Sequence, residues 1–407
     1  METFRRLSLD AEIAIKSDIS TFLIDETGAL YACGDNEYGQ LGLGEGDNRS
    51  TLTRVPLEES VKMVVTGGNS VYVLTVSGAL YACGFNGYGQ LGLGDYQNRS
   101  TLTRVPLEES VKTVATRDIS IYVVTISGVL YACGNNEYGQ LGLGDHLERL
   151  TLQRVPLEES VKTVTISYNC TYVLTRSGVL YTCGHNTFGQ LCVGDLSHRL
   201  TLTMVPLEEI VKTIVTGGSS TYVLTVDGTL YACGDNLSGQ LGLGDTQNRS
   251  LLTRVPLDET VKTVAIDSES IFVLTVSGAL YACGYNSSGQ LGLGDSWSRS
   301  TLTKVPLEER VKTVATGNSS TYVLIVSGTL YYCGCNTRGR LGLEGDHNRL
   351  TLTKAPLGES VKTVEIGLYS TFVLTVDEKF YACGYNEYGQ LGLGDEDSRS
   401  AFTLVPR

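Results

Sequence analysis

The sequence predicts an all-β protein, a β-propeller built from eight four-stranded repeats. The string YACG begins at Tyr31 and returns, with small changes, every 50 residues as far as Tyr381. All eight prolines, from Pro56 to Pro406, occupy one position of the same repeat. Eight units of this length fill nearly all of the 407 residues, so the repeats leave no room for a second domain.

We therefore expect one propeller domain over residues 1-407. Its repeat units are predicted at about residues 8-57, 58-107, 108-157, 158-207, 208-257, 258-307, 308-357 and 358-407.

The second unit shows how each repeat divides into strands. Runs rich in β-branched and aromatic residues occur at 61–65, 71–76, 79–84 and 101–107, and Gly, Asn, Asp and Ser fill the gaps. No stretch has a 3.6-residue period long enough for a helix. Four strands in such a unit match one propeller blade, whereas leucine-rich and ankyrin repeats are shorter and need a helical element. The first and last units are nearly complete, so closure is expected to set N-terminal strands against the last blade.

Composition and charge narrow the classes of partner. Hydrophobic residues make up 42% of the chain, which is too apolar for a disordered protein. The formal net charge of −13 disfavours a broad phosphate-binding surface, so direct binding of nucleic acid is not expected. The sequence offers neither a membrane-spanning apolar run nor the apolar core of a signal peptide. The expected location is intracellular, cytoplasmic or nuclear, and the expected state is a monomer.

The repeat has a recognisable pattern, V-x-x-V-x-x-G-x-x-S-x-Y-V-L-T-x-x-G-x-L-Y-x-C-G-x-N-x-x-G-Q-L-G-L-G, clearest at 311–342. This pattern resembles the repeat of the regulator of chromosome condensation family. The resemblance implies a propeller that usually has seven blades, so seven is the alternative to eight. The family includes an exchange factor for the nuclear GTPase Ran, a plant ultraviolet-B receptor and propeller modules of ubiquitin ligases. The resemblance therefore implies a fold more firmly than a function.

The chain departs from the family pattern in ways that bear on function. Serine or cysteine stands where family repeats usually have histidine, as at Ser70 and Cys170. The Ran exchange factor carries an inserted β-wedge, for which the uniform 50-residue spacing leaves no space. The ultraviolet receptor depends on a tryptophan cluster, which the lone Trp297 cannot make.

The repeated cysteines suggest a structural role. Eight of the eleven hold one strand position, and equivalent positions in neighbouring blades should exceed the ~7 Å Cα limit for a disulfide. We therefore expect small buried thiols packed between blades. Metal binding by Cys192, His185, His198 and Asp195, or by Cys333 with Cys335, is the weaker alternative. Nothing in the sequence indicates a cofactor.

The long loop of each unit also has a structural interpretation. Gly87–Gly92 spells G-x-G-x-x-G, but no helix is expected after it, so its glycines are expected to permit positive φ. Gln40 and its repeats are expected to hydrogen-bond the loop backbone. Arg99 and its repeats, mostly preceded by an aspartate four residues earlier, are expected to make a bidentate contact that holds the loop or joins blades.

Catalysis has little support, because the four histidines have no nucleophile or carboxylate at a recognisable spacing.

With four antiparallel strands, the first-to-second and third-to-fourth loops must share one face, and there the repeats differ. The opposite face is monotonous and acidic, with pairs such as Glu58-Glu59. Variable aromatic loop tips suit protein binding. The candidate binding residues are Asp35, Tyr38, Phe85, Tyr88, Tyr96, Arg117, Asp118, Tyr138, Tyr168, His185, Phe188, Asp235, Tyr285, Trp297, Arg338, Tyr369, Tyr385 and Tyr388.

Three functions stay open from the sequence. The leading prediction is a non-enzymatic propeller that binds a protein through this variable face. The second, implied by the family resemblance, is guanine-nucleotide exchange on a Ran-like small GTPase, for which the acidic tips Asp35, Asp118 and Asp235 could compete for Mg²⁺ and lysine. The third is a duplicated scaffold whose loops differ by drift and have no partner.

Overall fold

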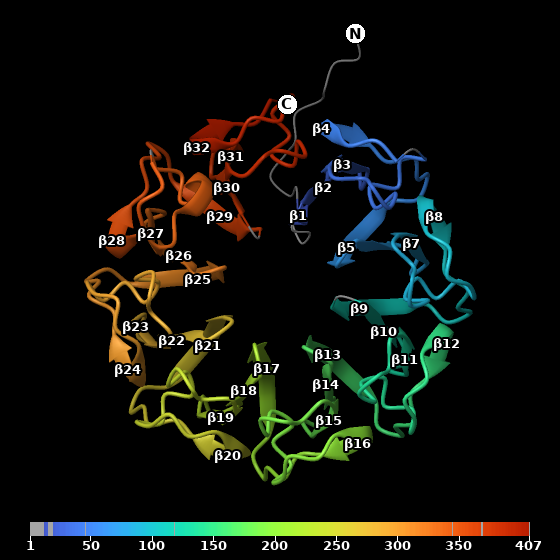
Figure 1. The fold of residues 1–407 in the computed structure, drawn as a ribbon, viewed down its shortest axis with the longest axis horizontal. Coiled ribbons are helices and arrows are strands. Elements are labelled where there is room, and N and C mark those ends of the chain that lie inside the picture. The colour runs from blue at the N-terminus through green and yellow to red at the C-terminus, as the bar shows by residue number, and fades with distance from the viewer. Residues whose placement is uncertain are drawn as a thin grey trace.

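The chain forms a ring of eight four-stranded antiparallel sheets around a central axis (Figure 1). The computed structural model describes residues 12–14, 19–44, 46–117, 119–343, 345–367 and 369–406, and for 12–14 only the backbone. Each sheet contains four strands that are consecutive in the chain, so the strand order within every blade is that of the sequence. The prediction of an eight-bladed propeller is confirmed, and the seven-bladed alternative is wrong because all eight units form complete blades.

The strands of blades 1 to 4 are β1 (Glu12–Ala14), β2 (Ser20–Ile24), β3 (Leu30–Gly34), β4 (Arg49–Arg54), β5 (Val61–Gly67), β6 (Ser70–Thr75), β7 (Leu80–Gly84), β8 (Arg99–Arg104), β9 (Val111–Arg117), β10 (Ser120–Thr125), β11 (Leu130–Gly134), β12 (Arg149–Arg154), β13 (Val161–Ser167), β14 (Cys170–Thr175), β15 (Leu180–Gly184) and β16 (Arg199–Met204).

The strands of blades 5 to 8 are β17 (Val211–Gly217), β18 (Ser220–Thr225), β19 (Leu230–Gly234), β20 (Arg249–Arg254), β21 (Val261–Asp267), β22 (Ser270–Thr275), β23 (Leu280–Gly284), β24 (Arg299–Lys304), β25 (Val311–Gly317), β26 (Ser320–Ile325), β27 (Leu330–Gly334), β28 (Arg349–Lys354), β29 (Val361–Ile366), β30 (Ser370–Thr375), β31 (Phe380–Gly384) and β32 (Arg399–Leu404). A single 3-10 turn, η1 (Thr337–Gly339), is the helical element of the described residues.

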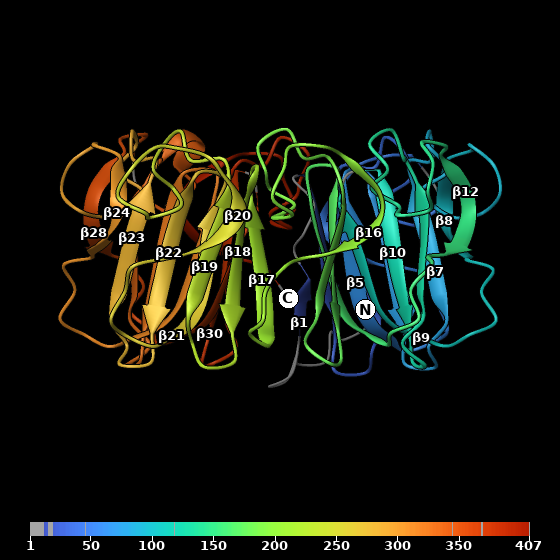
Figure 2. The same ribbon diagram turned by 90° about the horizontal axis from the view of Figure 1, so that it is seen from below.

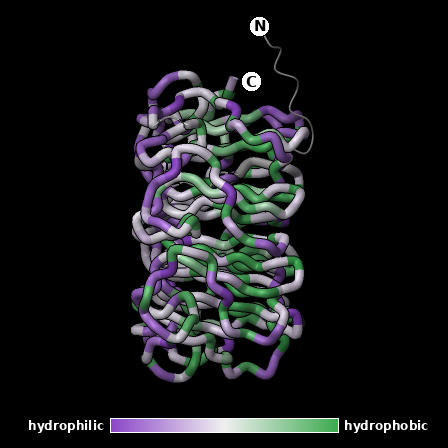
Figure 3. The backbone as a smooth tube through the Cα atoms, turned by 90° about the vertical axis from the view of Figure 1, so that its right-hand side faces the viewer, coloured by the Kyte–Doolittle hydropathy of each residue, from purple (hydrophilic) through white to green (hydrophobic). Residues whose placement is uncertain are grey.

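Burial follows the position of each strand in its blade. The second strand, such as β6, is buried at every residue, because both faces of its sheet pack on neighbouring blades. This is why it reads as an almost continuous apolar run. The outermost strand, such as β8, exposes Ser100, Thr101 and Arg104 at the rim and has no fully buried residue. Hydrophobic segments accordingly lie in the body of the disc (Figure 3).

Polar contacts join neighbouring blades inside this core. The buried Tyr122 of blade 3 donates its hydroxyl hydrogen bond to the Gln140 carbonyl at 2.7 Å. Thr171 of blade 4 donates to the same carbonyl at 2.9 Å, so both blades hold one loop. The carbonyl is thereby satisfied without water, as a buried polar group requires.

The ring closes through the contacts that join its internal seams. The Gly94 amide of blade 2 donates to the Leu150 carbonyl of the next outer strand at 2.8 Å. At the closing seam, the Gly394 amide of blade 8 donates to the Ser50 carbonyl of blade 1 at 2.9 Å. Thr21 of β2 also donates to the Gln390 carbonyl at 2.7 Å. N-terminal strands therefore lie against the last blade, as expected, while each sheet keeps its own four strands.

The strands run between two faces of the disc (Figure 2). The loops between first and second strands and between third and fourth strands lie on one side, which we call the loop face. The turns between second and third strands and the links from one blade to the next lie on the other side, the link face. In the part of the chain that the structure describes, no helix has the length and apolar character to cross a membrane.

The cysteine prediction needs one correction. Seven of the eight repeated cysteines are free and buried, and Cys133 is an example. The eighth, Cys233, forms a disulfide with Cys192, and their Cα atoms are 5.8 Å apart. The argument from equivalent positions missed this bond because Cys192 occupies a different position, where the other blades have glycine. In blade 3 that glycine is Gly142, which faces the sulfur of Cys183 in the next blade.

Candidate functional site

The long third-to-fourth loops of the loop face are held by a repeated set of polar side chains. In blade 2, Asn86 accepts from the Leu91 amide at 2.9 Å and donates to the Asp95 carbonyl at 2.8 Å. Gln90 accepts from the Tyr88 amide at 3.0 Å, which confirms the expected role of this glutamine. Gly89 and Gly92 have φ of 69° and 71°, as the tight loop requires. The scaffold fixes the backbone and leaves the tips free to vary.

The repeated arginine holds the loop in a way that differs from the expectation. Arg99 donates through Nη2 to one oxygen of Asp95 at 2.6 Å and through Nη1 to the Gln97 carbonyl at 2.7 Å. The contact is therefore shared between a carboxylate and a carbonyl rather than bidentate on the aspartate, and it stays within one blade. The hydrogen bond from Arg99, followed by that from the Gln97 amide, lowers the pKa of Asp95 below its ordinary value of 3.8.

The same two variable positions meet across several seams of the loop face. Tyr38 of blade 1 lies edge-on to Phe85 of blade 2, with ring centroids 5.3 Å apart. Tyr138 of blade 3 and His185 of blade 4 are related in the same way at 5.0 Å. In blades 7 and 8 the guanidinium carbon of Arg338 lies 4.1 Å from the ring centroid of Tyr385. Aromatic and cation–π pairs therefore bridge three seams.

Blades 7 and 8 have the most unusual of these clusters. Arg340 replaces the repeated glutamine and is only 2% exposed. Its guanidinium donates to the Asn318 carbonyl at 3.0 Å and lies 4.9 Å from the ring centroid of Tyr369. Desolvation lowers the pKa of Arg340 and raises the pKa of Asp267. The charge of each residue shifts the pKa of the other in the opposite direction and so offsets these changes in part. Arg338 lies over the same Tyr369 ring, also at 4.9 Å from its centroid.

Several candidate residues are well exposed. Trp297 has 75% of its surface exposed, and Tyr96, Tyr168 and Tyr285 are also exposed. The guanidinium carbon of Arg117 lies 4.6 Å from the ring centroid of Tyr168. These side chains can reach a partner without any rearrangement of the loops.

Other candidates are less available. Asp35 is only 4% exposed and accepts a hydrogen bond from Gln40 at 2.5 Å. Asp235 accepts from Gln240 at 2.9 Å. Tyr385 is 7% exposed and lies beneath the guanidinium of Arg338. Phe188 and Tyr388 are half-buried, and Asp118 lies outside the described residues.

The side chains considered for metal binding do not converge. The rings of His185 and His198 stack at 4.8 Å, and His198 accepts from the Asn186 amide at 2.9 Å. Asp195 pairs with Arg199, and Cys192 is bonded to Cys233 in the core. Burial, followed by the charge of His198, lowers the pKa of His185. Sequence reasoning grouped these residues by proximity in the chain, whereas the fold stacks the two histidines and gives Asp195 and Cys192 other partners.

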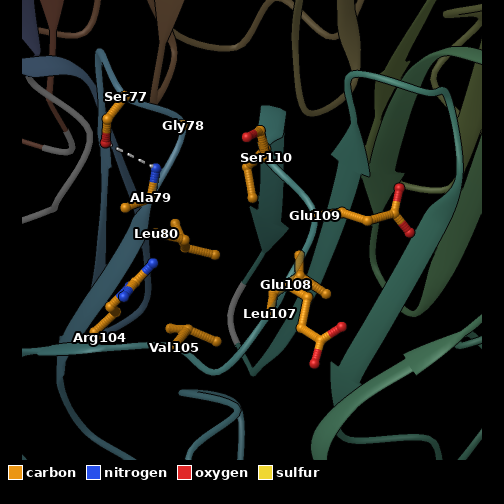
Figure 4. Close-up of a pocket in the computed structure, with 11 residues that line it drawn as sticks. Ser77, Gly78, Ala79, Leu80, Arg104, Val105, Leu107, Glu108, Glu109 and Ser110 are labelled. Atoms are coloured by element: carbon orange, nitrogen blue, oxygen red, sulfur yellow. Dashed lines mark hydrogen bonds between the residues drawn. The ribbon is translucent and has the colours of Figure 1, made fainter.

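Pockets occur on the link face and are small. One of about 220 Å³ lies where the Ser77–Leu80 turn meets the link that includes Arg104 and Glu108 (Figure 4). The Glu109 carboxylate is directed away from Arg104 in this view. It accepts from Ser127 and Tyr131 of the next blade, at 2.7 and 2.8 Å. The corresponding pocket of blade 5 has about 90 Å³, so this hollow follows from the blade-to-blade link.

The fold and its loops define a closed repeat propeller with one variable face. Sequence comparison matches the Regulator of chromosome condensation (RCC1) repeat to residues 27–74, 77–116, 127–174, 227–268, 277–324 and 377–407, with a second form of the repeat at 211–240. The chain belongs to the regulator of chromosome condensation repeat family.

Solved structures agree with this fold. The structure of human WBSCR16 is 20% identical, with a TM-score of 0.68 over 85% of this chain and 99% of that one. Prp20p of Saccharomyces cerevisiae is also 20% identical, with a TM-score of 0.65 over 84% of this chain and 90% of that one. The structure of Kap60 bound to yeast RCC1 (Prp20) gives 19% identity and a TM-score of 0.64 over 82% and 85%.

Proposed function

We propose that this protein is a non-enzymatic interaction propeller that binds a protein partner through its loop face. The observation that carries the proposal is the pairing of variable aromatic and arginine side chains across three seams. Tyrosine, tryptophan and arginine are the residues in which interface binding energy concentrates. A rigid ring that holds such residues on loops fixed by repeated hydrogen bonds loses little conformational entropy when it binds.

Trp297 and Arg338 allow a direct test. The Trp297 carbonyl accepts from Arg299 at 2.6 Å, so Trp297→Ala removes the exposed ring and keeps the loop contact. We expect a partner captured by the wild-type protein to bind the double variant Trp297→Ala/Arg338→Ala about tenfold or more weakly in a titration with purified components. The matched control is Val226→Ala/Val276→Ala, two exposed side chains in link-face turns. Equal loss in both variants, or no loss in the first, would show that the loop face is not the binding surface.

Nucleotide exchange on a Ran-like GTPase is the second candidate function. Prp20p, with which this chain shares its fold, is described with binding properties to Gsp1p and histones. Two of the acidic tips considered for exchange are engaged by glutamines, which weighs against them as free carboxylates. Release of a fluorescent GDP analogue from Ran and related GTPases tests this candidate. Acceleration by the wild-type protein would make exchange the primary function, and no acceleration would leave the binding propeller.

A further inference from the structure

Seven of the eight blades have a lysine at the second residue of the innermost strand. These residues are Lys62, Lys112, Lys162, Lys212, Lys262, Lys312 and Lys362. Each is the extra residue of a β-bulge. In blade 2, for example, Val61 pairs with Thr75 and Met63 pairs with Leu74, which leaves Lys62 without an opposing residue. The same register shift occurs in the other six blades. A bulge re-aims the side chain of its extra residue.

The bulge places these lysines around the axis of the ring, towards the link face. The innermost strands of neighbouring blades lie side by side around that axis (Figure 1). The lysines of blades 2 to 7 are exposed, and Lys362 of blade 8 is half-buried. Lys162 donates through Nζ to the Lys212 carbonyl of the next innermost strand at 3.4 Å, so its side chain runs along the inner ring. Blade 1 contributes β1, Glu12–Ala14, which has no lysine.

The acidic side chains of the link face do not neutralise the six lysines of blades 2 to 7. Among the described residues, the lysines of blades 2 to 7 form no ion pair. One repeated carboxylate of each link already has hydrogen-bond partners in most blades. Glu59, for example, accepts from Ser77 at 2.6 Å and from Tyr81 at 2.7 Å. Glu58 and its repeats are exposed on the links that run from the rim towards the lysines, so they form an acidic collar outside the lysine ring.

We propose that the lysine ring binds a small molecule with several clustered phosphate groups, centred on the axis at the link face. Like charges around one axis repel one another, and a multivalent anion between them relieves the repulsion. The Lys ammonium group is a strong donor to phosphate. The acidic collar and the net charge of −13 select against an extended polyanion such as duplex DNA, which would have to cross the collar.

Calorimetric titration of the intact protein with inositol hexakisphosphate and with inorganic tripolyphosphate tests this site. We expect binding of one molecule per chain that weakens as NaCl rises from 50 to 300 mM, because salt screens the attraction. The affinities of the two probes then distinguish an inositol phosphate from a linear polyphosphate. The triple variant Lys112→Gln/Lys212→Gln/Lys312→Gln should bind about tenfold or more weakly.

The control variant is Arg254→Gln/Lys304→Gln/Lys354→Gln, which makes the same change in net charge at exposed ends of outer strands on the same side. It should bind within about twofold of the wild type, because these charges lie outside the collar. Circular dichroism checks that both variants fold. No binding of either probe, equal weakening in both variants, several molecules bound per chain, or duplex DNA bound as tightly as the probes would each overturn the proposal.

Discussion

At the residue scale, the propeller depends on glycines whose roles differ although their backbone conformations match. Gly134 and Gly144 of blade 3 have φ of 97° and 91°. A Cβ on Gly134 would collide with the Ile119 carbonyl oxygen, which already accepts from the Asn135 amide at 3.0 Å. A Cβ on Gly144 would have one atom within 4 Å, Cγ2 of Thr201 at 3.8 Å. The first glycine permits close backbone approach, and the second permits only positive φ.

Alanine at these two positions separates the two roles. Gly144→Ala should lower the free energy of unfolding by about 1–2 kcal/mol, the cost of positive φ for an L-residue. Gly134→Ala should cost about 1–3 kcal/mol more, because the backbone must also shift to relieve the collision. Urea unfolding of the two variants and the wild type measures the difference. Equal effects of the two substitutions would show that the hairpin relaxes freely around Gly134.

At the element scale, one loop of blade 4 is linked covalently to a strand of blade 5. Cys192 has φ of 59° at a position that is glycine in the other blades, so it adopts a conformation that disfavours a side chain. Its disulfide to Cys233 of β19 closes a segment with a sequence separation of 41. The bond stabilises the fold by constraining the unfolded chain, while the Cys192 side chain destabilises the folded loop because of its positive φ.

Cys192→Gly should therefore have opposite effects in oxidising and reducing buffer. Without reductant, we expect the variant to be about 2–4 kcal/mol less stable than the wild type, because it lacks the cross-link. With dithiothreitol, it should be about 1 kcal/mol more stable, because glycine adopts positive φ at lower cost. Denaturant unfolding under both conditions measures the sign. If the variant is less stable in both, the Cys192 side chain stabilises the seam by packing rather than by its bond.

The elements themselves were accessible from the sequence, while contacts between blades were not. The strands are short apolar runs between glycine-rich turns, and the repeat exposes the same run eight times. The second strand of blade 2, expected at 71–76, is observed as Ser70–Thr75. Pairs such as Tyr38 with Phe85 join positions 47 residues apart in different units, which no local pattern reports. The burial of Asp35 was also missed, although Gln40, which donates to its carboxylate, lies only five residues further along the same loop.

At the scale of the whole molecule, repetition determines the number of blades. Each unit contributes a complete sheet, and the closing seam reproduces the contact of the internal seams, so an eighth blade fits without a special joint. Repetition also multiplies each small electrostatic contact around the ring. Carboxylates with lowered pKa recur at two positions, in the loop as Asp95 and in the link as Glu59. Their contributions to the pH dependence of stability therefore add up over several blades.

These carboxylates predict how stability depends on pH. Hydrogen bonds from Ser77 and then Tyr81 lower the pKa of Glu59 below 4.5, and those from Arg99 and the Gln97 amide lower the pKa of Asp95 below 3.8. A carboxylate with a lowered folded-state pKa stabilises the fold above its unfolded pKa and loses that contribution as the pH falls. Between pH 7 and the isoelectric point near 4.9 the net charge of −13 becomes smaller as the pH falls. Repulsion within the folded protein therefore decreases, which raises the free energy of unfolding over this range. We expect the free energy of unfolding to peak near pH 5 and to fall steeply from about pH 4.5 to 3, as urea unfolding at half-unit steps should show.

The triple variant Arg99→Gln/Arg149→Gln/Arg199→Gln tests the cause of that fall. It removes the donors to three aspartates whose pKa is lowered first by these arginines, Asp95, Asp145 and Asp195. The variant should be less stable at pH 7 and should lose less stability between pH 5 and 3, because its aspartates titrate nearer to their unfolded values. A variant at exposed lysines of the innermost strands, Lys62→Gln/Lys112→Gln/Lys212→Gln, makes the same change in net charge and should keep the wild-type slope below pH 4. If both variants flatten the curve equally, the acid transition reports the net charge of the ring and not the repeated arginine–aspartate contact.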